Sequence, residues 1–115
     1  MAEFEGKIEK IEKAKITNLD IINMVSEDSQ IKLRLELVKR INPFKESDPV
    51  KVLLDDKANP EEKPKLILSG LIYSITKKEG VKTFDINVGG LRLRLDTPET
   101  FGDFKAKSNI FISFF

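Results

Sequence analysis

The chain of 115 residues contains no cysteine and no histidine. Their absence excludes disulfide bonds, thiolate nucleophiles, zinc sites built from these two residue types, and every Ser-His or Cys-His catalytic pair. A strong charge of one sign is also missing, because 20 Lys and Arg residues face 19 Asp and Glu residues and leave a net charge of +1. No overall electrostatic attraction therefore draws the chain toward nucleic acid or an acidic membrane, although a local patch remains possible.

Long apolar runs are absent as well. No segment approaches the roughly 20 apolar residues of a membrane span. The first 15 residues are charged throughout and lack the apolar centre of a signal peptide. We therefore expect an intracellular, cytoplasmic protein, and the length fits one domain over residues 1–115.

Apolar residues recur at every second position along most of the chain, the pattern of strands with one buried face. The alternation breaks between Ile8 and Ile11, which predicts a bulge there. No internal repeat is evident. The predicted strands are 4–16, 19–25, 31–37, 50–54, 66–75, 83–88, 91–95 and 109–114.

Glycines and prolines mark the connections between these strands. Gly89 and Gly90 predict a two-residue hairpin that places Val88 opposite Leu91; a bulge within one long strand is the alternative. Gly70, inside a strand, predicts a bulge or a close backbone approach.

Other connections are predicted from composition. The segment 77–80 reads as a hairpin turn, and 55–65, with two prolines, reads as a solvated loop. Thr97 followed by Pro98 predicts one helical turn over 98–103. About eight short strands with at most one helical turn predict an all-β fold, a small antiparallel barrel of the OB type.

A basic stripe is the first candidate site. Lys32 and Arg34 should point outward from one strand, and Arg92 and Arg94 from another. If the two strands are neighbours, they form a face of the kind that OB-type barrels use for single-stranded nucleic acid, but these positions lack aromatic stacking residues. A solvated charged face and a contact with a partner protein are the alternatives.

Excess apolar surface is the second candidate. The segments 66–73 and 110–115 carry apolar residues on both faces, whereas a barrel covers only the inner face. The outer residues must then be covered by the chain's own loops or by a second polypeptide. Aromatic residues at such positions are typical of interface anchors.

Carboxylates form the third candidate, in the proline-containing loop. Asp55, Asp56, Glu61 and Glu62 share this loop but lack the burial that tunes a pKa for catalysis. Neither an EF-hand spacing nor a phosphate-binding glycine loop is present. We expect no catalytic residue, no metal site and no cofactor; an enzyme that uses these carboxylates is the remote alternative.

The later strands resemble a known family. Gly70-Leu-Ile-Tyr73, then Gly89-Gly90-Leu-Arg-Leu-Arg-Leu95, then a turn led by Phe104 into the last strand are similar to the C-terminal half of the eighth common subunit of nuclear RNA polymerases and of its archaeal counterpart, the G subunit of archaeal DNA-directed RNA polymerase. The segments 35–44 and 50–54 resemble the family's second and third strands more loosely. Nuclear members carry a longer acidic insertion where this chain has only 56–65, which favours an archaeal source.

The resemblance implies a non-catalytic subunit of DNA-dependent RNA polymerase, an OB-type barrel that docks on the largest subunit and supports assembly or stability. Its partners would be the largest subunit and neighbouring polymerase subunits, with indirect proximity to nucleic acid, no membrane and no small-molecule substrate. Its location would be the archaeal cytoplasm, beside the nucleoid. The alternative is a free-standing OB-fold protein that binds single-stranded nucleic acid, with an affinity that falls steeply with salt. The expected partner interface comprises Leu71, Tyr73, Gly89, Gly90, Arg92, Arg94, Phe111 and Phe114.

Overall fold

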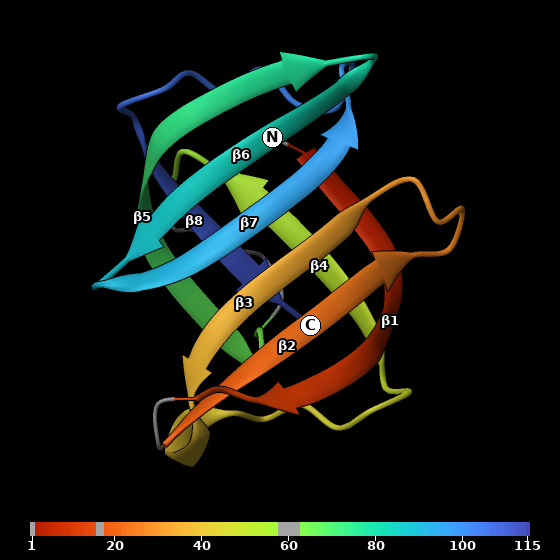
Figure 1. Ribbon diagram of the computed structural model, residues 1–115, viewed down its shortest axis with the longest axis vertical. Helices are drawn as coiled ribbons and strands as arrows, with labels where there is room; N and C mark the ends of the chain where they lie inside the picture. The colour runs from red at the N-terminus through yellow and green to blue at the C-terminus, as the bar shows by residue number, and fades with distance from the viewer. Residues whose placement is uncertain (1, 16–17, 58–62) are drawn as a thin grey trace.

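The computed structural model describes residues 2–15, 18–57 and 63–115 (Figure 1). These residues form eight antiparallel strands that close into a barrel in the order β1-β2-β3-β7-β6-β5-β8-β4, with β4 paired to β1. The predicted all-β barrel is therefore confirmed. The strands are β1 (Ala2–Lys13), β2 (Leu19–Ser26), β3 (Lys32–Val38), β4 (Pro49–Asp55), β5 (Leu66–Lys78), β6 (Val81–Val88), β7 (Leu91–Pro98) and β8 (Asn109–Phe114). In the described part of the chain, no helix is long and apolar enough to cross a membrane.

The predicted alternation of apolar and polar residues identifies the residues that form the core. On β3, Leu33, Leu35 and Leu37 are buried, while Lys32 and Arg34 are exposed. Successive side chains of a strand point to opposite faces, so each strand contributes every second residue to the barrel interior. The interior is consequently filled by aliphatic and aromatic side chains, and the outer face carries the residues available to a partner.

The barrel is built from two halves with the same topology, which the sequence did not reveal. In the first half the spatial order is β4-β1-β2-β3, and in the second it is β8-β5-β6-β7; each is a Greek key. The registers agree residue by residue: Ala2–Lys7 pair with β4 as Leu66–Leu71 pair with β8. Contacts of β3 with β7 and of β4 with β8 join the halves, so every outer position in one half has an equivalent in the other.

Both halves carry a bulge at the same place. β1 has its extra residue at Glu9, as the broken alternation predicts, and β5 has its extra residue at Tyr73. Gly70 is not the bulge but marks a close approach, since a Cβ there would lie 2.7 Å from Ile86 Cγ2. Tyr73 faces the outside of the barrel, where 49% of the residue is exposed, and the bulge interrupts the alternation in the residues that follow it.

The two predicted hairpins are confirmed. Val88 pairs with Leu91, and Gly89 and Gly90 between them have φ values of +59° and +93°. The β5–β6 turn likewise has Gly80 at φ +82°. Two residues at positive φ give the turn whose twist matches antiparallel strands, and glycine adopts it without steric cost.

The helical turn predicted over 98–103 is wrong. Phe101 N–H donates to Pro98 O over 3.1 Å, which closes a single turn, and Gly102 at φ +68° then redirects the chain. Aromatic packing explains the change of direction, because the Phe101 ring lies 6.3 Å from that of Phe4 and closes this end of the barrel. Within residues 2–15, 18–57 and 63–115, the helical turn that does occur is a 3-10 turn at Lys39–Ile41.

Two predictions extend beyond the described residues. The periodicity predicts that the first strand reaches residue 16; β1 ends at Lys13, and residues 16–17 lie outside the described part. Glu61 and Glu62 also lie outside it.

Candidate partner interface

Four apolar side chains share the outer surface of β5 and β8. Ile67, Leu71 and Tyr73 follow one another along β5 and are 43%, 42% and 49% exposed. Phe111, half-buried on β8, pairs with Ser69, which lies between Ile67 and Leu71 on β5. We call these four residues, Ile67, Leu71, Tyr73 and Phe111, the apolar face.

The first half of the barrel has the same surface built from other residues. The ladder registers make Glu3, Lys7, Glu9 and Lys51 the equivalents of the apolar face, in the order given above. All four are charged, and Lys51 Nζ lies 3.8 Å from Glu3 Oε2 in an ion pair. The barrel fold thus tolerates charged residues at these positions, so architecture does not require the apolar ones.

Phe114 does not belong to this surface, contrary to the expectation. It has no exposed area, and its ring packs edge-on against Phe44 with centroids 5.5 Å apart. β8 lies between β4 and β5, so its alternate residues Ile110, Ile112 and Phe114 all fill the interior. Phe111, one position out of phase, is the aromatic residue of β8 that faces outward.

The predicted basic stripe exists, but carboxylates interrupt it. β3 and β7 are neighbours, and Arg34 lies opposite Arg94. Arg94 Nε donates to Asp85 Oδ1 over 3.1 Å. The backbone N–H of Arg92 donates to Glu36 Oε1 over 2.9 Å. The hydrogen bond to Asp85, and then its charge, raise the pKa of Arg94.

Tyr73 stands at the end of this stripe, an arrangement that sequence analysis missed. A shallow hollow of about 250 Å³ is lined by Tyr73, the arginines and the two carboxylates. A second hollow, of about 230 Å³, lies between Tyr73, Gly90 and Arg92, beside the exposed Gly89–Gly90 tip. The broken alternation between Ile8 and Ile11 predicts the bulge of the first half. Nothing in the sequence around Tyr73, however, places this residue near β7, which is two strands away from β5 in the sheet.

These features bear on the nucleic-acid alternative. Tyr73 supplies one aromatic platform, whereas binders of single strands combine several with a continuous basic groove. Glu36 and Asp85 share the hollow with the arginines and would repel a phosphate backbone. The surface therefore matches a mixed protein contact better than a nucleic-acid groove.

Of the four loop carboxylates, Asp55 and Asp56 lie in the described part of the chain, and neither shows the environment of a general acid. The hydrogen bond with the Asp56 side chain lowers the pKa of Asp55, whereas a general acid near neutral pH needs a raised one. In residues 2–15, 18–57 and 63–115, no group of three or more Asp or Glu side chains is placed to hold a metal ion.

A closed eight-stranded barrel that exposes an apolar face beside ordered charges defines a small binding module. A comparison with protein families makes the class specific: the family model for the G subunit of DNA-directed RNA polymerase matches residues 1–113. The chain belongs to this family. It is an accessory subunit of RNA polymerase, not catalytic by itself, and associates with other polymerase subunits.

The other comparisons add little. No curated protein matches the chain. Among solved structures, the cytoplasmic molybdate-binding protein ModG, with molybdate bound, is similar at 12% identity and a TM-score of 0.39, with 96% of this chain and 87% of that chain covered. A likeness at this level supports no statement about ligands.

Proposed function

We propose that this subunit docks on the largest subunit of RNA polymerase through the apolar face and thereby supports assembly or stability of the enzyme. The archaeal cytoplasm, beside the nucleoid, is the location that this role requires. The role needs no chemistry from the barrel itself, only a surface that a second polypeptide covers.

The internal comparison is the observation that carries the proposal. The same outer positions are apolar on β5 and β8 and charged on β1 and β4. The exposed area of these apolar side chains contributes nothing to folding, whereas its burial against a partner contributes about 25 cal/mol per Å² before the costs of association. Tyr73 and Phe111 are also of the residue types enriched at the centres of interfaces.

Charged and glycine residues border the apolar face. Arg92 and Arg94 are exposed on β7, and Gly89 and Gly90 leave the hairpin tip open, since a Cβ added at either glycine would meet no atom within 4 Å. A flat tip allows close approach of a partner backbone. Rim arginines set orientation and association rate more than affinity.

The test exchanges the two surfaces. In one variant Leu71→Lys and Tyr73→Glu copy the first-half residues Lys7 and Glu9. In the matched control, Lys7→Glu and Glu9→Lys exchange the charges of the first-half surface. Binding is measured to polymerase purified from cells that lack this subunit. Loss of a central aromatic anchor weakens binding by about 30-fold or more.

Both variants should keep the wild-type circular dichroism spectrum, because the barrel already tolerates charges at these positions. The β5 variant should lose binding and the control should retain it. Full occupancy of polymerase by the β5 variant would contradict the proposal. A photo-crosslinking residue in place of Phe111 then identifies the neighbour, and a crosslink to some other subunit alone would contradict the choice of the largest one.

A further inference from the structure

The edge of β5 is open beyond its bulge. Lys78 and Val81 close a two-residue hairpin turn, so they form a hydrogen-bonded pair, and Ile75 and Lys77 must direct their N–H and C=O groups away from β6. On that side the ladder with β8 ends at Leu71. The connection after β7 extends it by one residue only, through Ile72.

The equivalent edge in the first half is capped. Ile11 is the equivalent of Ile75, and its N–H also points away from the neighbouring strand. Glu46, in the connection from β3 to β4, accepts this N–H at Oε2 over 2.9 Å. A side-chain carboxylate therefore satisfies this backbone donor of β1.

The second half lacks this cap. Residues 39–48 and 99–108 are equivalent connections, because Ile8 N–H donates to Asp48 O as Ile72 N–H donates to Ser108 O. Ala106 consequently occupies the position of Glu46, and its methyl group cannot accept a hydrogen bond. Within the described residues, no acceptor in this connection bonds Ile75 N–H.

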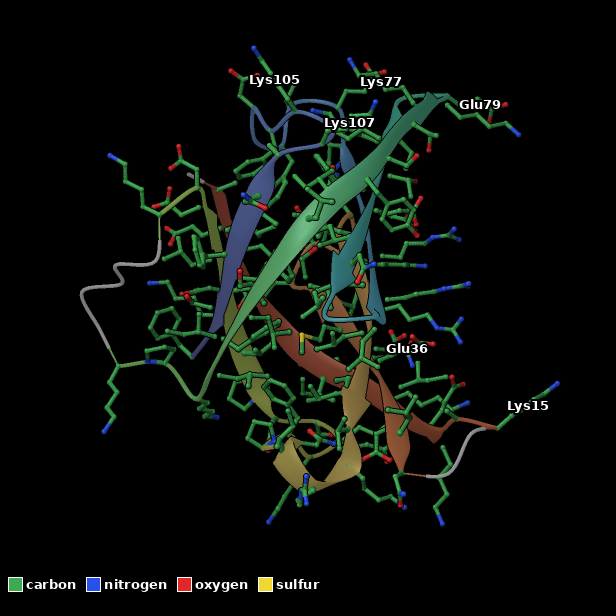
Figure 2. All side chains as sticks on the ribbon, turned by 90° about the vertical axis from the view of Figure 1, so that its left-hand side faces the viewer. Lys15, Glu36, Lys77, Glu79, Lys105 and Lys107 are labelled. Carbon is green, nitrogen blue, oxygen red and sulfur yellow. The ribbon has the colours of Figure 1, made fainter. Side chains whose placement is uncertain are left out.

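Three lysines lie at the same end of the barrel as the open site. Lys105 and Lys107 flank Ala106, and Lys107 N–H donates to Ile72 O, which places this connection against β5. Lys77 lies on the edge itself. Figure 2 shows Lys77, Lys105 and Lys107 at the same end of the barrel, with Glu79 at the tip of the β5–β6 hairpin. The surroundings are therefore suited to a carboxylate.

We propose that the open edge of β5 at Ile75 binds an acidic, extended segment of a neighbouring polymerase subunit. A carboxylate of that segment accepts Ile75 N–H as Glu46 accepts Ile11 N–H, and Lys77, Lys105 and Lys107 balance its charge. The segment lies along the edge as an added strand, a common mode of peptide recognition. Tyr73 directly precedes this edge, so the site is continuous with the apolar face. The inference rests on the proposed function for the identity of the neighbour.

The test installs the missing cap. Ala106→Glu places a carboxylate where the first half has Glu46, and Ala106→Lys is the control of similar size and opposite charge. In the isolated chain, Ile75 amide hydrogen exchange should be fast and Ile11 exchange slow; Ala106→Glu should slow Ile75 exchange, and Ala106→Lys should not. This measurement also reports whether each variant is folded.

The variants are then bound to polymerase that lacks this subunit. Ala106→Glu should bind about tenfold or more weakly, because the edge is already occupied and its charge is reversed, while Ala106→Lys should bind as the wild type does. The wild-type Ile75 amide should become protected in the complex.

The outcomes separate the two proposals. Wild-type binding with no protection of Ile75, or equal binding of Ala106→Glu and the wild type, overturns the edge site and leaves the docking function standing. Failure of the wild-type chain to bind polymerase overturns both.

Discussion

Arg34 and Arg94 lie directly opposite each other across β3 and β7, and each is the equivalent of the other in the two halves of the barrel. Like charges in this position repel. Asp85 offsets this repulsion at Arg94 through an ion pair of 3.1 Å. The equivalent of Asp85 in the first half is Asn23, which carries no charge. The two arginines therefore share a position in the fold but differ in electrostatic environment.

This difference predicts unequal effects of the same substitution. Arg34→Gln removes the repulsion and should leave stability unchanged or raise it by up to about 0.5 kcal/mol. Arg94→Gln also removes the partner of Asp85 and should be less stable than Arg34→Gln by up to about 1 kcal/mol, since the Arg94 side chain is 62% exposed and water screens the ion pair. Urea denaturation measures both, and identical midpoints for the two variants would contradict the assignment.

Alanine substitutions at the equivalent residues Gly6 and Gly70 should lower the free energy of unfolding by different amounts. A Cβ at Gly6 would lie 1.9 Å from Val25 O, a backbone atom, whereas at Gly70 the nearest atom is Ile86 Cγ2, a side-chain atom, at 2.7 Å. Backbone cannot move aside as a side chain can, so Gly6→Ala should cost about 3 kcal/mol or more, and Gly70→Ala about 1–3 kcal/mol. Thermal unfolding of the two variants checks this order, which the reverse ranking would disprove.

Phe111 and Phe114 should have opposite phenotypes. Phe114→Ala empties a fully buried site and should cost about 3–5 kcal/mol of unfolding free energy. Phe111→Ala removes a half-buried outer ring, so it should cost less stability but weaken binding to polymerase. Chemical denaturation and binding measured on the same preparations distinguish the roles; a destabilised Phe111→Ala variant with normal binding would argue for a purely structural ring.

Asp28 should account for part of the loss of folding stability at low pH. Hydrogen bonds from Ser26 Oγ, and next from Gln30 N–H, lower the pKa of Asp28 below its usual 3.8. A lowered pKa means that the ionised form stabilises the fold above the unfolded-state value, and this stability is lost as the pH falls through the folded-state value. Asp28→Asn should therefore flatten the decline in melting temperature below about pH 4. An unchanged acid limb in this variant would exclude the contribution.

The two halves also differ at the edges of β1 and β5, at Ile11 and Ile75. Glu46 and Ala106 occupy equivalent connections, yet one satisfies a backbone N–H and the other leaves it free. A sequence search for repeats does not find this relationship, because the halves share hydrogen-bond register more than side-chain identity.

The sequence by itself determined which residues form strands and, on the strands that alternate regularly, which of them face inward. Strand periodicity and turn chemistry are local, so the alternation on β3, the bulge at Glu9 and the Gly89–Gly90 hairpin could all be predicted from neighbouring residues. The helical turn over 98–103 could not be judged in this way, because the packing of Phe101 on Phe4 joins segments far apart in the chain.

Only the tertiary structure decided which outer residues meet. The pairing of β3 with β7 and of β4 with β8 is non-local. The first brings Arg34 to the hollow that Tyr73, Arg92 and Arg94 also line, and the second helps to determine which face of β8 is inside, where Phe114 is buried. The last strand is apolar on both faces, so its pattern could not indicate which face is inside. Barrel closure settled that choice, because a closed sheet has one interior, and the register of the neighbouring strands determines which side chains fill it.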